Sequence, residues 1–214
     1  TGVVPVIVNN STILAEVENG TKTSHSRITA GDSIGIIAAA DSDIYIIAGG
    51  LAAAGANAAG ASINTAILKN DIPAHAGTWT ELMTTATPAV QTSSNGIRIP
   101  NRNERRRGII IFANGNEDVV MVSVSAGAGG SNAITGVINT LVVRNTVKAT
   151  SREHVTISVK KAAGSSTNDT DPLPGVYIEA HDDTELLNLA GALSAAGSVG
   201  VGATVVALVF NKNV

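Results

Sequence analysis

The amino-acid sequence predicts an all-β protein, a β-solenoid in which similar coils stack on one another, and two observations lead to this prediction. Residues 35–72 recur as residues 110–147 and again as residues 177–214, so the chain contains three homologous blocks. An internal repeat of this length is typical of arrays in which each unit packs against its neighbours. In addition, 44% of the residues are hydrophobic but only 2% are aromatic. Small aliphatic side chains suit stacked rungs, because neighbouring strands lie only about 4.8 Å apart.

The three blocks align closely when the first is moved forward by 75 positions and the second by a further 67. Identical residues then coincide, and elsewhere acidic, β-branched or large apolar residues coincide in kind. We therefore expect the blocks to form equivalent, mainly parallel β units. The coinciding sets include Ala38, Ala113 and Ala180; Ala53, Ala128 and Ala195; Gly55, Gly130 and Gly197; and the acidic Asp43, Asp118 and Glu185.

Each block presents the same order of expected elements. A short apolar strand precedes an acidic turn, a second strand, a run of Gly, Ala, Ser and Asn, and a longer β-branched strand that stops at a polar pair. Asn and Gly tolerate left-handed backbone, so we expect them to separate the runs of Val and Ile. In the first block the strands are residues 34–38, 44–48 and 62–68, with the turn at residues 41–43 and the stop at Lys69-Asn70.

The segments between the blocks contain all the variation in length between the copies. Each opens in a similar way, so its first strand is expected to belong to the scaffold and the remainder to be inserted. Residues 84–96 and 162–174, rich in Ser, Thr and Pro, are expected to be surface loops, and the alternating residues 155–159 to be a further strand. These variable connectors are residues 14–33, 73–108 and 148–175.

The whole chain, residues 1–214, is interpreted as a single β-solenoid segment. Residues 6–13 reproduce the end of a block in kind, so the chain starts and finishes in nearly the same phase. We expect a segment of a longer repetitive protein to have this organisation.

Charge and composition exclude several functional classes. A net charge of −3 gives the chain no general attraction to nucleic acid, and the absence of cysteine excludes disulfides and thiolate chemistry. Three uncharged runs, residues 44–68, 119–143 and 186–210, are long enough to cross a bilayer. Their middles consist of small residues without an aromatic belt or basic flanks. We therefore predict no membrane insertion, and a membrane-inserting toxin segment is an alternative.

The acidic turns recur at one phase, so a solenoid would align them as a ladder along one edge. Such a ladder could hold Ca²⁺ through carboxylates and turn carbonyls, or it could simply be solvated and keep the edge soluble. The calcium-binding glycine-aspartate nonapeptide repeat does not occur in the sequence. No metal site is therefore predicted.

The candidate partner-binding residues lie in the longest connector. Guanidinium groups pair bidentately with oxyanions, so an arginine cluster there is a candidate site for a sulfated or sialylated host or bacterial surface glycan. The alternative is a solvated loop whose arginines pair with Glu104 or with the acidic turns. A tryptophan in the same connector, with His75 near it, could be a carbohydrate platform or could fill a packing gap. The candidates are Arg102, Arg105, Arg106, Arg107 and Trp79.

Catalysis finds little support in the sequence, so we predict no enzyme, no catalytic residue and no cofactor. The histidines, His25, His75, His154 and His181, lie outside the apolar strands at no matching phase. Metal-ligand spacings, nucleophile elbows and phosphate-binding loops are all missing from the sequence. A carbohydrate-active β-helix enzyme, a polysaccharide lyase or hydrolase, is the alternative, because such enzymes assemble acids and bases from different rungs.

The pattern of the blocks is an acidic pair, a short aliphatic strand, a Gly/Ala-rich run and a β-branched strand, and then Asn followed by Thr-Val-x-Ala, as in residues 145–149. This pattern resembles the repeats of large bacterial surface proteins of the filamentous-haemagglutinin and leukotoxin-like adhesin group. The resemblance covers the three blocks. It implies a right-handed parallel β-helix, exported by a type V pathway to the surface of a Gram-negative bacterium, as a structural and adhesive shaft. The arginine-bearing connector and the Pro-rich residues 171–174 depart from the pattern.

The closing strand of each block predicts self-association, because it is largely apolar on both of its alternating faces. In the second block Ile138, Thr140 and Val142 lie on one face, whereas Asn139, Leu141 and Val143 lie on the other. A solenoid wall buries only one face, so a connector or a neighbouring molecule must cover the second. We expect end-to-end or lateral association of copies.

Overall fold

The computed structural model describes residues 2–85, 96–160 and 174–214, and within these ranges every regular element is a β-strand. No helix in this described part of the chain is long and apolar enough to cross a membrane. The strands are β1 (Gly2–Val3), β2 (Val6–Thr12), β3 (Ala15–Val17), β4 (Ser26–Ala30), β5 (Ile34–Ala54), β6 (Asn57–Ala76), β7 (Thr80–Thr84), β8 (Ile97–Arg98), β9 (Arg105–Arg106), β10 (Gly108–Gly129), β11 (Asn132–Ser151), β12 (Thr156–Val159), β13 (Gly175–Ala196) and β14 (Val199–Asn213).

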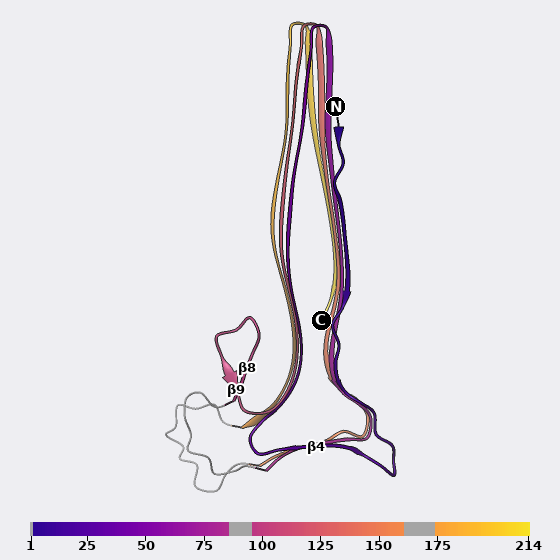
Figure 1. The fold of residues 1–214 in the computed structure, drawn as a ribbon, viewed down its shortest axis with the longest axis vertical. Coiled ribbons are helices and arrows are strands. Elements are labelled where there is room, and N and C mark those ends of the chain that lie inside the picture. The colour runs from indigo at the N-terminus through magenta and orange to yellow at the C-terminus, as the bar shows by residue number, and fades with distance from the viewer. Residues whose placement is uncertain (1, 86–95, 161–173) are drawn as a thin grey trace.

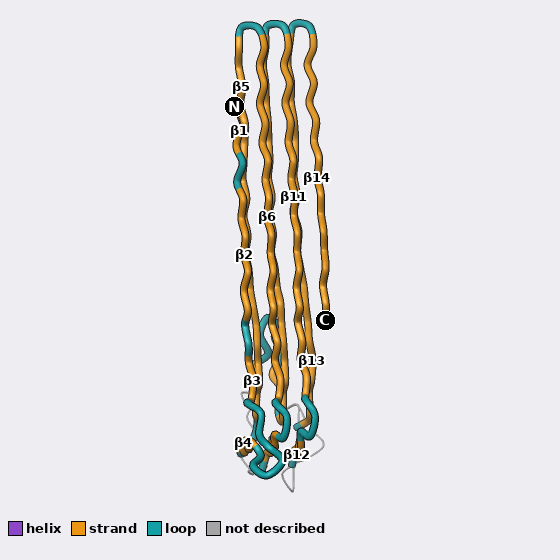
Figure 2. The backbone as a smooth tube through the Cα atoms, turned by 90° about the vertical axis from the view of Figure 1, so that its right-hand side faces the viewer, coloured by secondary structure: helices purple, strands orange, loops and turns teal. Residues whose placement is uncertain are grey.

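The molecule is a long, narrow stalk that stands on a wider foot (Figure 1). In each coil one long strand rises from the foot to the tip, and a second returns (Figure 2). The rising strands pair in the order β5-β10-β13 and form the ascending sheet. The returning strands β6, β11 and β14, with β1, β2 and β3 alongside β6, form the descending sheet. All these pairs are parallel, so the structure is all-β with parallel strands in stacked sheets, which is compatible with a solenoid.

The register between coils is the one that the sequence repeat predicts. Ala113 pairs with Ala38 on one side and with Ala180 on the other, and Ala128 pairs in the same way with Ala53 and Ala195. Identical residues therefore stack in rows across the coils. A row here means the residues that adjacent strands of one sheet place side by side.

The prediction of acidic turns is wrong, because each long strand continues without a break through the acidic residues. In β5 burial alternates regularly across residues 41–43, with Asp41 and Asp43 on the outer side and Ser42 facing inward. The strand continues because its backbone groups pair with the neighbouring coil along its whole length. A pair of acids at alternate positions faces water and does not interrupt the ladder.

The expected stop at Lys69-Asn70 is also wrong, since β6 continues to Ala76 and β11 continues to Ser151. The Gly- and Ala-rich runs are not single loops. Each one contains the end of a rising strand, two turn residues at the tip and the start of a returning strand. These turns are residues 55–56, 130–131 and 197–198.

The core between the two sheets contains two apolar clusters. The lower cluster includes Ile36, Ile72 and Ile111, and the upper cluster includes Leu68 and Leu141. Polar side chains separate them at the level where the acidic residues interrupt the apolar pattern. The prediction of a core built from aliphatic side chains is thus confirmed for these clusters.

The connectors contribute more to the scaffold than the sequence indicates. β3 continues the descending sheet beside the end of β6, as expected for the first strand of a connector. Beyond it, β4, β7 and β12 pair in parallel and form the foot sheet, so these parts are not insertions. The expected strand at residues 155–159 is confirmed as β12. Most of the two expected surface loops lies outside the described residues, at residues 86–95 and 161–173.

Candidate functional site

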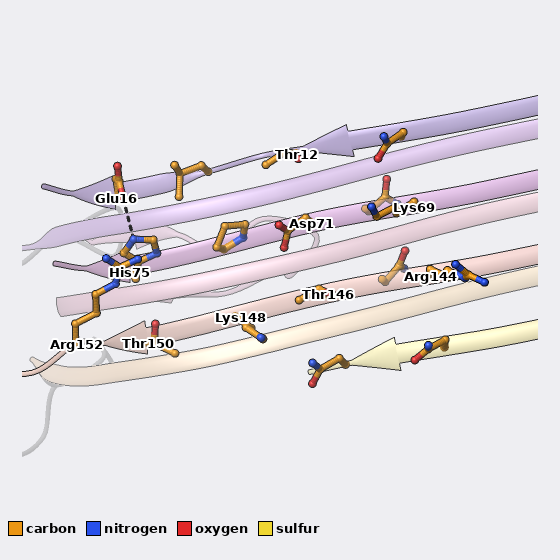
Figure 3. Close-up of a pocket in the computed structure, with 17 residues that line it drawn as sticks. Thr12, Glu16, Lys69, Asp71, His75, Arg144, Thr146, Lys148, Thr150 and Arg152 are labelled. Atoms are coloured by element: carbon orange, nitrogen blue, oxygen red, sulfur yellow. Dashed lines mark hydrogen bonds and ion pairs between the residues drawn. The ribbon is translucent and has the colours of Figure 1, made fainter.

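A groove of about 1000 Å³ lies on the outer face of the descending sheet, near the foot. Its floor consists of the ends of β2, β6, β11 and β14 together with β3 (Figure 3). Alternate residues of each strand face outward, so every coil contributes side chains at the same heights. The labelled lining residues are Thr12, Glu16, Lys69, Asp71, His75, Arg144, Thr146, Lys148, Thr150 and Arg152.

The groove carries more positive than negative side chains. Lys69 lies beside Arg144 in one row, and Lys148 and Arg152 follow closer to the foot. One of the negative groups is already paired, because the carboxylate of Glu16 lies 2.8 Å from the Nε2 atom of His75. Cations in adjacent rungs lie about 5 Å apart, so they would favour an anionic partner.

The opposite, outer face of the ascending sheet is acidic at the same part of the stalk. Asp43, Asp118 and Glu185 form one row, and the amide of Asn116 donates a hydrogen bond of 2.9 Å to Asp41 in another. The predicted alignment of acidic residues is therefore confirmed, but on strands and not at turns. Within the described ranges no group of three or more His, Cys, Asp or Glu residues is arranged to hold a metal ion.

A buried polar layer separates the two apolar clusters, and Glu117 is its centre. Its side chain is fully buried, Asn70 donates to its Oε1 atom at 3.1 Å, and Thr184 donates to its Oε2 atom at 2.8 Å. Burial raises the pKa of Glu117, the charge of Asp182 raises it further, and the hydrogen bonds and Lys212 act against this rise. Lys212 also lies 3.2 Å from Asp182. The carboxylates of Glu117 and Asp182 lie between the sheets, so they link neighbouring strands inside the core and do not form an open site.

Glu117→Gln is expected to raise the free energy of unfolding at neutral pH. The pKa of Glu117 is raised in the folded state, so ionisation costs stability as the pH rises from the unfolded pKa through the folded one. Glutamine keeps the shape without that cost. Thermal unfolding measured from about pH 3 to about pH 8 should show the gain above about pH 4.3 and its loss below this value. Glu185→Gln, on the outer face, is the control, and an equal gain for Glu117→Gln at every pH would contradict the assignment.

The arginine cluster lies on the β8–β9 hairpin and its surroundings, which fold over the lower part of the ascending sheet. Arg106 pairs with Glu179 and, at 3.0 Å, with Glu104, and its guanidinium lies 4.7 Å from the ring centre of Tyr177. Arg102 pairs with Glu104 at 3.4 Å. The structure therefore has the intramolecular pairs that the solvated-loop alternative requires.

The two remaining arginines also bond within the chain. Arg105 donates to the carbonyl of Gly96 at 2.8 Å. Arg107 is buried, and its Nε atom donates to Asp32 at 3.0 Å. The hydrogen bond from Arg107 lowers the pKa of Asp32, and burial opposes this effect. A hydrogen bond from Ser33 lowers the pKa further, by a smaller amount. Arg107 thus attaches the start of β10 to the preceding coil.

Trp79 lies at the corner between β6 and β7, away from the arginines. Its ring stacks on His154 with 3.8 Å between ring centres and on the other side approaches His25 at 5.7 Å. Trp79 and His154 occupy equivalent corners of successive coils, both with left-handed backbone, at φ of 58° and 57°. The ring is a structural contact between coils, and the five predicted residues do not form one surface.

The groove is not predicted from the sequence, because the polar pairs Lys69-Asn70 and Arg144-Asn145 are expected there to end their strands. A signal was nevertheless present. Continuing the alternation through these pairs places Lys69 and Arg144 on the outer face, in phase with Asp71 and Thr146. The block alignment alone thus contained the row of cations.

Comparisons with known proteins found no match to a protein-family model, to a curated protein or to a solved structure. The resemblance to filamentous-haemagglutinin repeats stays a prediction.

Proposed function

We propose that this chain is a structural and adhesive shaft segment of a secreted bacterial surface protein, without catalytic activity. The shaft is a right-handed parallel β-helix that lengthens by adding coils. The parallel stack of coils supports this proposal, because such scaffolds carry loads and display surfaces along their length. The enclosure of Glu117 and Asp182 supports the lack of catalysis, since their carboxylates face the core.

The observation that carries the proposal is the open core at the last coil. Leu208 and Phe210 face inward, yet they are 43% and 47% exposed. Leu141 and Val143, their row neighbours in the middle coil, are completely buried. Among the strands of the described ranges, β13 and β14 each have a neighbour on one side only. A further coil would bury these side chains and pair the other side of each strand.

Leu208→Glu combined with Phe210→Glu should prevent further coils from stacking on this end. Two carboxylates in the open core would be buried without partners by an added coil, and that burial is costly. We expect the wild-type protein to form particles that lengthen along the stacking direction with concentration, and the variant to remain short. Electron microscopy separates this length from the width of the particles.

The matched control is Val205→Glu combined with Val209→Glu. These residues lie on the same strand but on its outer face, so stacking of coils should persist. Equal particle lengths for the two double variants, or a wild-type protein that never lengthens, would contradict the proposed shaft.

A further inference from the structure

The upper part of the stalk has two apolar outer faces. It comprises residues 44–68, 119–143 and 186–210, which contain no charged residue. On the ascending face Ile47 is 80% exposed and Leu193 is 69% exposed. Monomeric proteins rarely expose apolar surface that extends over whole sheets.

Polar side chains of the upper stalk lie mainly inside it. Asn139 donates to Asn188 at 2.7 Å, and the hydroxyl groups of Thr135 and Ser194 lie 2.8 Å apart. The lower ascending face shows how the chain covers an apolar outer surface when it does so itself. There Ile99, beside the β8–β9 hairpin, packs against Phe112, and both are buried.

The internal hydrogen bonds show which outer rows of the two sheets lie at the same height. Asn70 reaches Glu117, whose row contains Ser42, and Asn145, in the same row as Asn70, reaches Asp182, two residues closer to the foot. The outer rows of Asp43 and Lys69 therefore lie within one residue step of each other, and rows this close are called level. Nearer the tip Thr135 meets Ser194, while Asn139 meets Asn188, so the descending rows there also lie within one residue step of the ascending rows. The outer row of Leu193 lies one residue closer to the foot than the row of Ser194. The outer row of Ala203 lies one residue closer to the foot than the row of Thr135, so these two outer rows are also level.

Two adjacent pairs of outer rows complement each other in size. In one pair the ascending face has mainly large side chains and the descending face small ones, and in the next pair the sizes are reversed. Facing surfaces that alternate in this way interdigitate closely. The row Leu51, Ala126, Leu193 is level with Ala61, Gly136, Ala203, and the row Gly49, Val124, Gly191 is level with Ile63, Ile138, Val205.

The same two faces complement each other in charge. Below the apolar rows, the acidic row of Asp43, Asp118 and Glu185 is level with the basic row that contains Lys69 and Arg144. The β8–β9 hairpin stands out from the ascending face below its acidic row (Figure 1). The groove of the descending face begins at its basic row and extends toward the foot, so a protrusion on one face lies at the height of a hollow on the other.

We propose that a second copy of this chain covers the upper stalk. Its descending face packs on the ascending face of the first copy, with the two stalks pointing the same way and their rows level. Each copy then keeps one free ascending or descending face, so the contact repeats and builds an open layer of parallel stalks. The proposal does not depend on the stacking of coils, because it uses the outer faces and not the open end.

A lipid bilayer is the other possible cover, since the apolar rows extend over about 33 Å, close to the thickness of a hydrocarbon core. Two observations favour a second copy. The strands β5 and β13 end the ascending sheet, and open sheet edges are not tolerated in hydrocarbon. Lipid also gives no reason for level rows of opposite charge and complementary size.

The decisive experiment is a charge exchange between the two faces. One variant carries Asp43→Lys, Asp118→Lys and Glu185→Lys, and the other carries Lys69→Glu and Arg144→Glu. Each variant alone brings like charges together, so its self-association should weaken by about tenfold or more. Mixing the two should restore association, because the reversed rows then meet. All these proteins also carry Leu208→Glu and Phe210→Glu, which prevent further coils from stacking on the open end. Their sedimentation therefore measures only the association of the outer faces.

Reversal of Glu18 and Glu153 on the foot is the control and should leave association unchanged. A second measurement uses the absence of cysteine in the chain: Leu193→Cys and Ala203→Cys proteins should form a disulfide dimer when mixed, but not singly. This measurement also replaces the charge exchange if a reversed variant does not fold.

Three results would overturn the proposal. The first is that the Leu208→Glu, Phe210→Glu protein with unchanged outer faces remains monomeric to near-millimolar concentration. The second is that the mixture of charge-reversed variants associates no better than either variant alone. The third is that each cysteine variant forms disulfide dimers by itself. Flotation of the wild-type protein with phosphatidylcholine vesicles, with no association in their absence, would assign the faces to lipid instead.

Discussion

Gly108→Ala is expected to destabilise the protein by about 3 kcal/mol or more, through backbone strain together with a steric clash. Gly108 has a φ of 100°, which L side chains rarely adopt. An added Cβ atom would overlap the carbonyl oxygen of Gly175 and would lie 2.6 Å from its amide nitrogen. Both atoms belong to the neighbouring coil, so neither can move without disturbing the pairing of β10 with β13. Chemical denaturation monitored by circular dichroism measures the loss.

Gly191→Ala is the matched control for that change. Its Cβ atom would meet nothing within 4 Å, and the backbone is extended, so we expect a change of less than about 1 kcal/mol. If both variants lost the same stability, the close contact between Gly108 and Gly175 would be incorrect.

Leu141→Ala should cost about 2–5 kcal/mol, the usual range for removing a buried leucine side chain. Leu141 is fully buried in the upper apolar cluster, between coils that lie on both sides of it. Leu208 occupies the same row in the last coil but is 43% exposed, so Leu208→Ala should cost much less. The difference between the two free energies of unfolding measures how open the end of the stack is.

The comparison should be made at low and at high protein concentration. If copies add to the open end, the cost of Leu208→Ala should rise with concentration, whereas the cost of Leu141→Ala should stay constant. A Leu208→Ala cost equal to that of Leu141→Ala at every concentration would show that the last coil is already covered.

The sequence repeat predicts the register of the coils, because identical small residues such as Ala53, Ala128 and Ala195 occupy one row of the tip. It does not predict where strands end. Asp41 and Asp43 have low β propensity in isolation, but pairing with the next coil along the whole strand outweighs that preference. The foot sheet was missed for a related reason, since β4, β7 and β12 are short and gain stability only by pairing with one another.

The candidate site was harder to predict than the fold. The arginines attract attention because they are consecutive, yet in the structure Arg107 bonds with Asp32 and Arg106 with Glu179, which are far away in sequence. Lys69 and Arg144 are inconspicuous in the sequence because 75 positions separate them, and only the pairing of β6 with β11 makes them neighbours. A surface assembled from single residues of successive coils has no local motif.

The parallel pairing of the coils has a consequence for the way in which the chain folds. β5 and β6 are consecutive, but they belong to different sheets, so neither is the backbone partner of the other. Hydrogen-bonded partners in adjacent coils are 59, 67 or 75 residues apart. Closing the first loop of this size costs about 4 kcal/mol of chain entropy before any row is complete. Nucleation is therefore slow, whereas each later coil docks on a finished template, and a preformed stack should act as a seed that removes the lag.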